Sequence, residues 1–226
     1  MAEIFKLTGI RGFVARKMRE SLAKTAQLTF HGELDASQMV AARALFKEQG
    51  LPASYEDMII MTLAQSVTEF PLFNSCLTQA GLELSEQINI NIAIDTDVGL
   101  MAPALFDVTS LNLQEIARLR KDLIGRAGRN KLTVTEQSGG TITVSNLGTT
   151  RVQYFTPILN YPQIALLGVG TMTRRAVADE QGKIEMRPFI GLSLTVDHAV
   201  IDGAPSGKFL TNLCERLERF NYLKEA

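Results

Sequence analysis

The sequence contains little histidine, little cysteine and almost no net charge. Its 226 residues include two histidines and two cysteines, and the formal net charge is −1 at pH 7. Histidine and cysteine are too few for a typical zinc site, so we expect no metal. The balance of charges lacks the basic excess of proteins that bind nucleic acid or an anionic membrane surface. We therefore expect neither nucleic acid nor a membrane as a partner.

Long apolar runs are missing as well. No stretch is long enough to span a bilayer, and residues 1–6 lack the apolar centre and the cleavage site of a signal peptide. Cys76 and Cys214 lie far apart in apolar surroundings, which predicts buried free thiols in a reducing compartment. We expect a cytoplasmic protein, with an organelle matrix as the alternative if a targeting segment is absent from this chain.

The composition predicts a single α/β domain. Hydrophobic residues make up 46% of the chain and charged residues 21%, as in ordinary globular proteins. We find no internal repeat and no linker, so residues 1–226 should form one domain, with residues 1–25 as an N-terminal arm or helix. Helical patterns come first and strand patterns with long connections follow, which favours an α/β fold.

Polar residues mark where several helices should begin. Asp35 is typical of a residue that caps a helix, and Ser54 with Asp57 matches a capping box. The segment 107–110 should cap another helix, and the basic loop 126–131 after it fits either a phosphate contact or a solvated helix end. The predicted helices cover residues 11–24, 36–49, 54–70, 111–125 and 204–223.

Short apolar or alternating runs predict the strands. Such runs are typical of strands that are buried on one or both faces of a sheet. His31 lies in the first of them and receives no catalytic role. The predicted strands cover residues 28–34, 73–78, 88–95, 100–105, 140–146, 164–171 and 189–196, and residues 175–186 should form a hairpin that turns at 180–182.

The segment Leu192–Gly203 is the strongest candidate for chemistry. It begins as a strand pattern and continues into His198, with Asp202 four residues later and a helical pattern after that. Histidine is the side chain that titrates near neutral pH, so His198 is the leading candidate for a general base. The alternative is a histidine that is simply satisfied in the core.

Ser145 ends a second predicted strand, and its strand end is expected to converge with that of His198. A histidine and a hydroxyl at one site suit acyl transfer, in which the histidine deprotonates the attacking group and the hydroxyl stabilises the oxyanion. The alternative is a nucleophilic Ser145 that His198 activates, as in hydrolases. The sequence around Ser145 lacks the Gly-x-Ser-x-Gly elbow, and no nucleotide phosphate-binding loop is present.

The segment His-Ala-Val-Ile-Asp-Gly at 198–203 resembles the His-x-x-x-Asp-Gly motif of dihydrolipoamide acyltransferases, the core enzymes of 2-oxo acid dehydrogenase complexes. Chloramphenicol acetyltransferases carry the same motif. Further similar stretches occur, in the family's order, at 9–18, 88–93, 143–148 (Thr-Val-Ser-Asn-Leu-Gly), 155–160 (Phe-Thr-Pro-Ile-Leu-Asn) and 162–170. The resemblance covers almost the whole chain.

The resemblance implies a chloramphenicol acetyltransferase-like two-layer α/β sandwich with a mixed sheet. It implies a homotrimer with the active site between subunits, and a 24-mer or 60-mer core as a larger assembly. The reaction would move an acyl group, with acetyl as the first expectation, between the lipoamide thioester and coenzyme A. The lipoyl group would come from another domain or chain, and the complex would be a 2-oxo acid or acetoin-type dehydrogenase with its other subunits as partners.

The resemblance also implies roles for five residues. His198 would be the general base and Ser145 would stabilise the oxyanion. Asp202 would be a structural support of the turn, with Arg11 or Arg16 as a candidate partner. Thr143 and Asn146 would contact the substrate, the least specific of these assignments.

Other functions fit the same residues. The chain resembles the catalytic domain alone, without a lipoyl or subunit-binding domain, so we expect either an excised core or a stand-alone protein. Alternatives are a stand-alone trimeric coenzyme A-dependent acetyltransferase that acts on a small acceptor, and a core scaffold without activity. Apolar residues such as Phe220 near the C-terminus fit either contacts between trimers or packing within the subunit.

Overall fold

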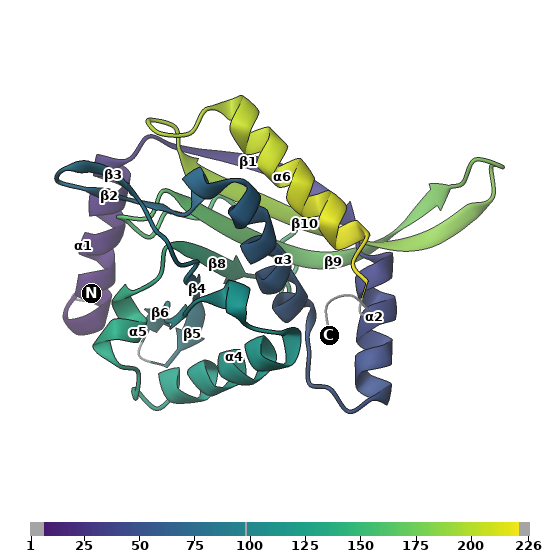
Figure 1. Ribbon diagram of the computed structural model, residues 1–226, viewed down its shortest axis with the longest axis horizontal. Coiled ribbons are helices and arrows are strands. Elements are labelled where there is room, and N and C mark those ends of the chain that lie inside the picture. The colour runs from purple at the N-terminus through teal and green to yellow at the C-terminus, as the bar shows by residue number, and fades with distance from the viewer. Residues whose placement is uncertain (1–6, 98, 222–226) are drawn as a thin grey trace, which may run out of the picture.

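The computed structural model describes residues 7–97 and 99–221, which fold into two layers. A six-stranded mixed sheet forms one layer, and helices on one of its faces form the other (Figure 1). This arrangement confirms the predicted two-layer α/β sandwich. The helices are α1 (Gly9–Lys24), α2 (Ser37–Glu48), α3 (Tyr55–Glu69), α4 (Leu113–Ala127), α5 (Val134–Ser138) and α6 (Gly203–Glu218), with 3₁₀ turns at Pro71–Phe73 and Val108–Ser110.

The strand order of the large sheet is β1-β10-β9-β8-β4-β7. Strands β8 and β9 run parallel, as do β4 and β8, whereas β10 is antiparallel to both of its neighbours. The strands are β1 (Gln27–Asp35), β4 (Ile90–Ile92), β7 (Ala104–Leu105), β8 (Ile142–Asn146), β9 (Ala165–Ala178) and β10 (Ile184–Asp197); two small ribbons pair β2 (Ser75–Thr78) with β3 (Gly81–Leu84) and β5 (Ile94–Thr96) with β6 (Gly99–Met101).

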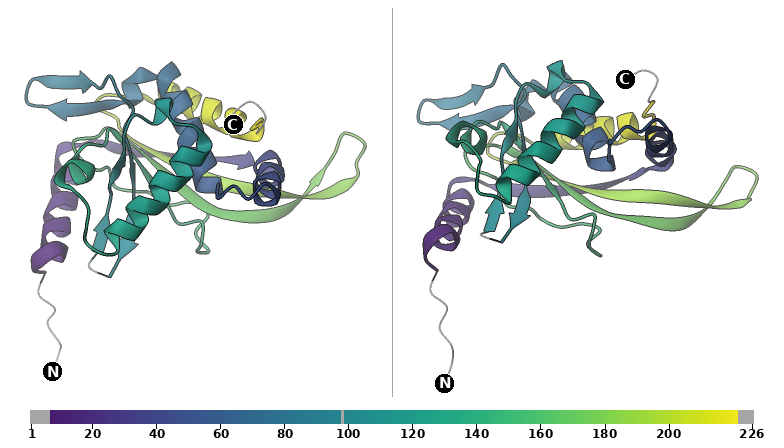
Figure 2. Two further views of the ribbon diagram at one scale, coloured as in Figure 1. Left: turned by 60° about the horizontal axis from the view of Figure 1, so that its bottom comes forward. Right: turned by 90° about the horizontal axis from the view of Figure 1, so that it is seen from below.

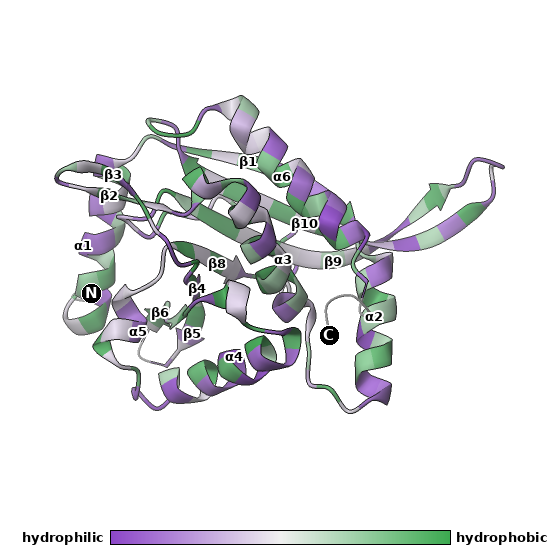
Figure 3. Ribbon diagram, viewed as in Figure 1, coloured by the Kyte–Doolittle hydropathy of each residue, from purple (hydrophilic) through white to green (hydrophobic). Residues whose placement is uncertain are grey.

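The core lies between the sheet and its helical layer. Side chains alternate between the two faces of a strand, so every second residue of β10 points to the helices. Figure 3 shows the resulting hydrophobic and hydrophilic stripes on α4 and α6. At Gly32 of β1 an added Cβ would lie 3.0 Å from Leu210 of α6, so glycine there lets the helix approach the sheet closely. Fully buried core residues include Leu192, Leu194, Val196, Phe209 and Leu213.

An irregular segment, 147–164, connects β8 to β9 and crosses the other face of the sheet. The backbone N–H of Phe155 donates to the buried Ser193 hydroxyl of β10 at 3.3 Å. A Cβ on Gly170 would lie 1.9 Å from the carbonyl oxygen of Gln153, so only glycine permits this approach. The segment therefore covers the sheet face that the helices leave open.

Strands β9 and β10 extend beyond the sheet as a two-stranded arm (Figures 1 and 2). The predicted hairpin is confirmed, since Ala178 pairs with Ile184 across the turn. The predicted strands 164–171 and 189–196 are confirmed in position but were too short, because β9 and β10 each continue without interruption into the arm. Helix α1 lies at the opposite end of the molecule from the arm (Figure 2).

Two of the three predicted helix starts need correction. The capping box of Ser54 and Asp57 at the start of α3 is confirmed. Asp35 ends β1, and its carboxylate accepts the backbone N–H of Ser37, so α2 begins later than predicted. Asn112 and Glu115 form the capping box of α4, in place of the predicted segment 107–110, because the chain first makes a 3₁₀ turn there.

Charged residues in the last turns of α4 pair with each other and with α5. Arg126 donates to Asp122 at 2.7 Å and to Glu136 of α5 at 2.5 and 2.8 Å. Of the two interpretations of this basic loop, the ion pairs favour a charged helix end for Arg126. The short helix α5 was not predicted.

Candidate active site

His198 stands on a turn that directly follows β10. Its side chain is 44% exposed, and its backbone N–H donates to the carbonyl oxygen of Ala26 at 2.8 Å. The buried carboxylate of Asp197 accepts the backbone N–H of Ala26 at 2.9 Å and that of Ala199 at 3.1 Å. The turn is thus fastened to the segment between α1 and β1. Asp197 was not predicted from the sequence, although an aspartate that bonds the backbone two residues on is a known turn signal.

Asp202 does not hold the turn through its side chain. The Asp202 carboxylate is 84% exposed, and Oδ1 lies 3.6 Å from Nδ1 of His198, which is too long for a hydrogen bond. Its carbonyl oxygen accepts from Ser206 in the first turn of α6. In the part of the chain that the structure describes, Asp202 pairs with neither Arg11 nor Arg16.

Ser145 lies on the sheet face that faces away from the helices. It is half-buried, and its hydroxyl makes no hydrogen bond to the residues that the structure describes. In register beside it is Gly168, where an added Cβ would lie 2.8 Å from the ring of Phe155. The aromatic ring therefore lies over Gly168, next to a serine hydroxyl that is available to a ligand.

Thr143 and Asn146 differ in their surroundings. The buried Thr143 hydroxyl donates to Gln163 at 2.5 Å and shares the sheet face of Ser145. Asn146 points to the opposite face, where its side-chain oxygen accepts the backbone N–H of Gly148 at 2.7 Å. The predicted substrate contacts of Thr143 and Asn146 stay predictions, and both side chains already have protein partners.

The structure does not bring Ser145 and His198 together within one chain. Because β8 is parallel to β9 and β10 is antiparallel to it, the ends of β8 and β10 point to opposite edges of the sheet. Ser145 aligns through Gly168 with Ser193, five residues before His198. Two steps between neighbouring strands and the rise over five residues give a separation of about 19 Å between the backbones of Ser145 and His198. The expectation that these two strand ends converge in one subunit was wrong.

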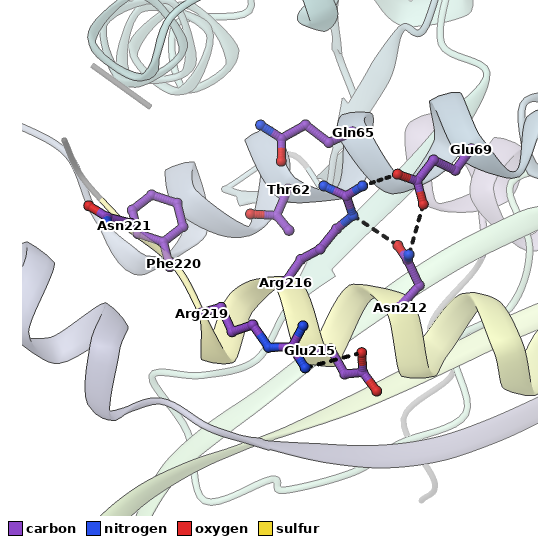
Figure 4. Close-up of a pocket in the computed structure, with 9 residues that line it drawn as sticks. All are labelled: Thr62, Gln65, Glu69, Asn212, Glu215, Arg216, Arg219, Phe220 and Asn221. Carbon is purple, nitrogen blue, oxygen red and sulfur yellow. Dashed lines mark hydrogen bonds and ion pairs between the residues drawn. The ribbon is translucent and has the colours of Figure 1, made fainter. Parts of the chain in front are cut away.

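One hollow between two helices is not near these residues. A cavity of about 440 Å³ lies between α3 and the C-terminal half of α6, at the end of that helix that is far from His198 (Figure 4). Arg216 there bonds both Glu69 and Asn212, so the polar groups already satisfy one another. We assign no catalytic role to this cavity. Beside it Phe220 is buried in the core, whereas residues 222–226 lie outside the described part.

The thiols and acidic groups give no sign of a second centre. Cys76 and Cys214 are free, as predicted, and burial raises the pKa of Cys214 to about 12. Within residues 7–97 and 99–221, no three of histidine, cysteine, aspartate and glutamate are grouped so as to hold a metal ion. No helix in the same ranges is long and apolar enough to cross a membrane.

Solved structures identify the class of protein that this fold represents. Chloramphenicol acetyltransferase shares it, with a TM-score of 0.56 and 21% identity over 96% of this chain and all of that one. The crystal structure of a probable dihydrolipoamide acetyltransferase from Listeria monocytogenes is far more similar, with a TM-score of 0.92, 29% identity and coverage of 100% and 98% of the two chains. The fold is that of an acyltransferase of this class.

The family follows from the sequence comparisons. The family described as 2-oxoacid dehydrogenases acyltransferase (catalytic domain) matches residues 2–224, and the chain belongs to it. A relative from Corynebacterium glutamicum, the dihydrolipoyllysine-residue acetyltransferase component of pyruvate dehydrogenase complex, is 34% identical over 96% of this chain and 34% of its own length. The chain spans about a third to a half of the length of the curated relatives it matches. The predicted family of acyltransferase catalytic domains is confirmed.

A further structure is that of the dihydrolipoamide acetyltransferase of Azotobacter vinelandii, with a TM-score of 0.89 and 28% identity over 96% of this chain and 92% of that one. Its description names a serine, a histidine and an asparagine for their role in the catalytic mechanism. Another neighbour is described as the cubic core of the pyruvate dehydrogenase multienzyme complex.

Proposed function

We propose that this chain transfers an acyl group, with acetyl as the first expectation, between the lipoamide thioester and coenzyme A in a 2-oxo acid dehydrogenase complex. The observation that carries the proposal is the pair of Ser145 and His198. The Ser145 hydroxyl bonds no other residue that the structure describes, and Asp197 holds the turn of His198 in place. Similarity to the acetyltransferase components of pyruvate dehydrogenase complexes supports the choice of substrates.

The spacing of the residues named for the Azotobacter enzyme supports the assignment. Its histidine and asparagine are four positions apart, as are His198 and Asp202. Its serine precedes the histidine by 52 positions, and Ser145 precedes His198 by 53. We therefore place His198, Asp202 and Ser145 at the corresponding positions, with an aspartate where that enzyme has an asparagine.

The chemistry then follows from two side chains. His198 takes the proton from the thiol of coenzyme A, and the thiolate attacks the carbonyl carbon of the acyl-lipoamide thioester. Ser145 donates a hydrogen bond to the tetrahedral oxyanion, a contribution typically worth about 3 to 4 kcal/mol. The bond from carbon to the lipoamide sulfur breaks, and the proton passes from His198 to that sulfur.

The separation of about 19 Å between the two residues requires a second copy of the chain. A homotrimer in which each subunit lends His198 to one neighbour and Ser145 to the other satisfies this requirement. The lipoyl group would arrive on another domain or chain. The description of one neighbour as a cubic core supports a larger assembly built from such trimers. The free thiols support a reducing compartment, for which we propose the cytoplasm.

Acetyl-coenzyme A and dihydrolipoamide test the proposal, with S-acetyldihydrolipoamide measured by mass spectrometry. The wild-type protein should form it, and His198→Ala should be slower by about 10²- to 10⁴-fold. His31→Ala is the matched control, since it removes the other histidine and should retain most activity. Transfer only to a small amine or hydroxyl acceptor would favour a stand-alone acetyltransferase, and absence of any transfer would favour a scaffold. Full activity in His198→Ala would overturn the mechanism.

A further inference from the structure

Ser145 belongs to a row of residues that crosses four adjacent strands of the large sheet. It is in register with Gly168 of β9, which is in register with Ser193 of β10. The row ends at His31 of β1, whose Nδ1 lies 2.9 Å from the Ser193 hydroxyl oxygen. Residues directly opposite each other on neighbouring strands point to the same face of a sheet. A group that lies over Gly168 therefore lies beside the Ser145 side chain.

The aromatic ring of Phe155 is that group. An added Cβ on Gly168 would lie 2.8 Å from Cζ and 3.0 Å from Cε1 of the ring, so the ring fills the place that a side chain would take. Neighbouring strands are only about 4.8 Å apart, which puts the edge of the ring next to the side chain of Ser145. Phe155 is half-buried, so it is partly open to a ligand that reaches Ser145.

The backbone before the ring is fixed at one height over the sheet. The N–H of Phe155 donates to the buried Ser193 hydroxyl at 3.3 Å. Two residues earlier, the carbonyl oxygen of Gln153 would lie 1.9 Å from a Cβ on Gly170 and 2.3 Å from a Cβ on Gly191. These glycines let the segment lie directly against β9 and β10, so the ring of Phe155 cannot move away from Ser145 without breaking these contacts.

We propose that Phe155 is a specificity-determining residue, whose ring forms one wall of the acyl pocket and excludes acyl groups longer than acetyl. The inference rests on the proposed role of Ser145. A hydroxyl that stabilises the oxyanion lies about 2.7 to 3.1 Å from the carbonyl oxygen of the acyl group. The chain attached to that carbonyl must then lie close to the ring beside Ser145. One methylene more or less in an apolar pocket changes a rate about 10- to 200-fold.

A comparison of two acyl donors tests the proposal, with kcat/KM measured for acetyl- and butyryl-coenzyme A and dihydrolipoamide as the acceptor. The wild type should prefer acetyl, and Phe155→Ala should raise the ratio of butyryl to acetyl transfer about tenfold or more. Tyr154→Ala is the matched control. Its ring is the adjacent aromatic one, but it packs against His31 at 5.4 Å and its hydroxyl donates to Glu33, both on β1. Tyr154→Ala should leave the ratio within about twofold.

The outcomes separate the inference from the proposed function. If Phe155→Ala keeps the wild-type ratio, or if the wild type uses both donors equally well, the inference is wrong and the proposed function stands. If the wild type transfers neither acyl group, the proposed function fails and takes the inference with it. Should Phe155→Ala not fold, as judged by thermal melting, Phe155→Leu removes the ring but keeps an apolar side chain. It should raise the ratio by a smaller factor, and an unchanged ratio would overturn the inference.

Discussion

The backbone N–H of Ala26 donates a hydrogen bond of 2.9 Å to the Asp197 carboxylate. The two residues are far apart in sequence, and their bond holds the turn of His198 in place. Removing that buried acceptor in Asp197→Ala should cost about 1 to 3 kcal/mol of stability, because backbone donors lose their partner. It should also slow acyl transfer, since His198 is the next residue. Asp197→Asn keeps one acceptor oxygen, so it should lose less stability and less of the acyl-transfer rate.

Urea unfolding and initial rates measure these two effects. The surface variant Lys183→Ala, in the turn of the arm, is a suitable control and should change neither quantity. Wild-type stability and rate in Asp197→Ala would contradict the proposed fastening of the turn.

Trimers of mixed composition test whether His198 and Ser145 of different chains form one site. Co-expression of His198→Ala and Ser145→Ala chains with different tags, followed by two affinity steps, yields only mixed trimers. One of the three sites in each then has both residues, so activity should reach about one third of the wild-type value. Two tagged His198→Ala chains, purified in the same way, should stay inactive. Mixed trimers no more active than the parents would show that the residues do not meet across subunits.

The Glu136–Arg126 pair should give a specific pH dependence of stability. The Arg126 guanidinium lowers the pKa of Glu136 to about 2 from an ordinary value of 4.5. A carboxylate with a lowered pKa in the folded state stabilises the protein above its unfolded pKa, and this contribution is lost as the pH falls to the folded value. The difference in unfolding free energy between wild type and Glu136→Gln should therefore be constant above about pH 5 and shrink between about 4.5 and 2.

Urea titrations at several pH values measure this difference. Its size should be modest, because water and salt screen an ion pair that lies near the surface. Glu115→Gln is a useful comparison, since Glu115 belongs to the capping box of α4 and pairs with no arginine among residues 7–97 and 99–221. A difference that grows as the pH falls would have the wrong sign.

The two thiols should resist alkylation in the folded protein. Burial raises the pKa of Cys214 to about 12 and also raises that of the half-buried Cys76. At pH 8 only about one Cys214 in ten thousand is then a thiolate, which is the reactive form. Mass spectrometry after treatment with iodoacetamide should show Cys214 labelled only in denaturant. Rapid labelling of Cys214 in the native protein would contradict its burial.

Local patterns predicted much of the fold. The capping box of Ser54 and Asp57 and the apolar stripe of α6 depend on residues within a few positions of each other, and the structure has both. The short helix α5 was missed, since five residues are too few to show a helical period. The long strands β9 and β10 were divided in the prediction because their polar arm residues break the apolar pattern.

The geometry of the site was harder to predict than the identity of its residues. Neither periodicity nor motif states the direction of a strand, which depends on how the chain returns to the sheet. The segment 147–164 carries the chain back so that β9 runs parallel to β8, and this crossing sends the ends of β8 and β10 to opposite edges. The contact of Asp197 with Ala26 could not be predicted from local patterns either, because it joins residues that are distant in sequence.

Strand β10 is one continuous element from Ile184, near the tip of the arm, to Asp197. At about 3.3 Å per residue it spans about 45 Å. Its register with β9 shifts between Ile190 and Leu192, at the base of the arm. The arm therefore contains one end of the strand whose other end lies next to His198. A displacement of the arm along β10 would therefore pass through this irregular step before it reached the turn of His198.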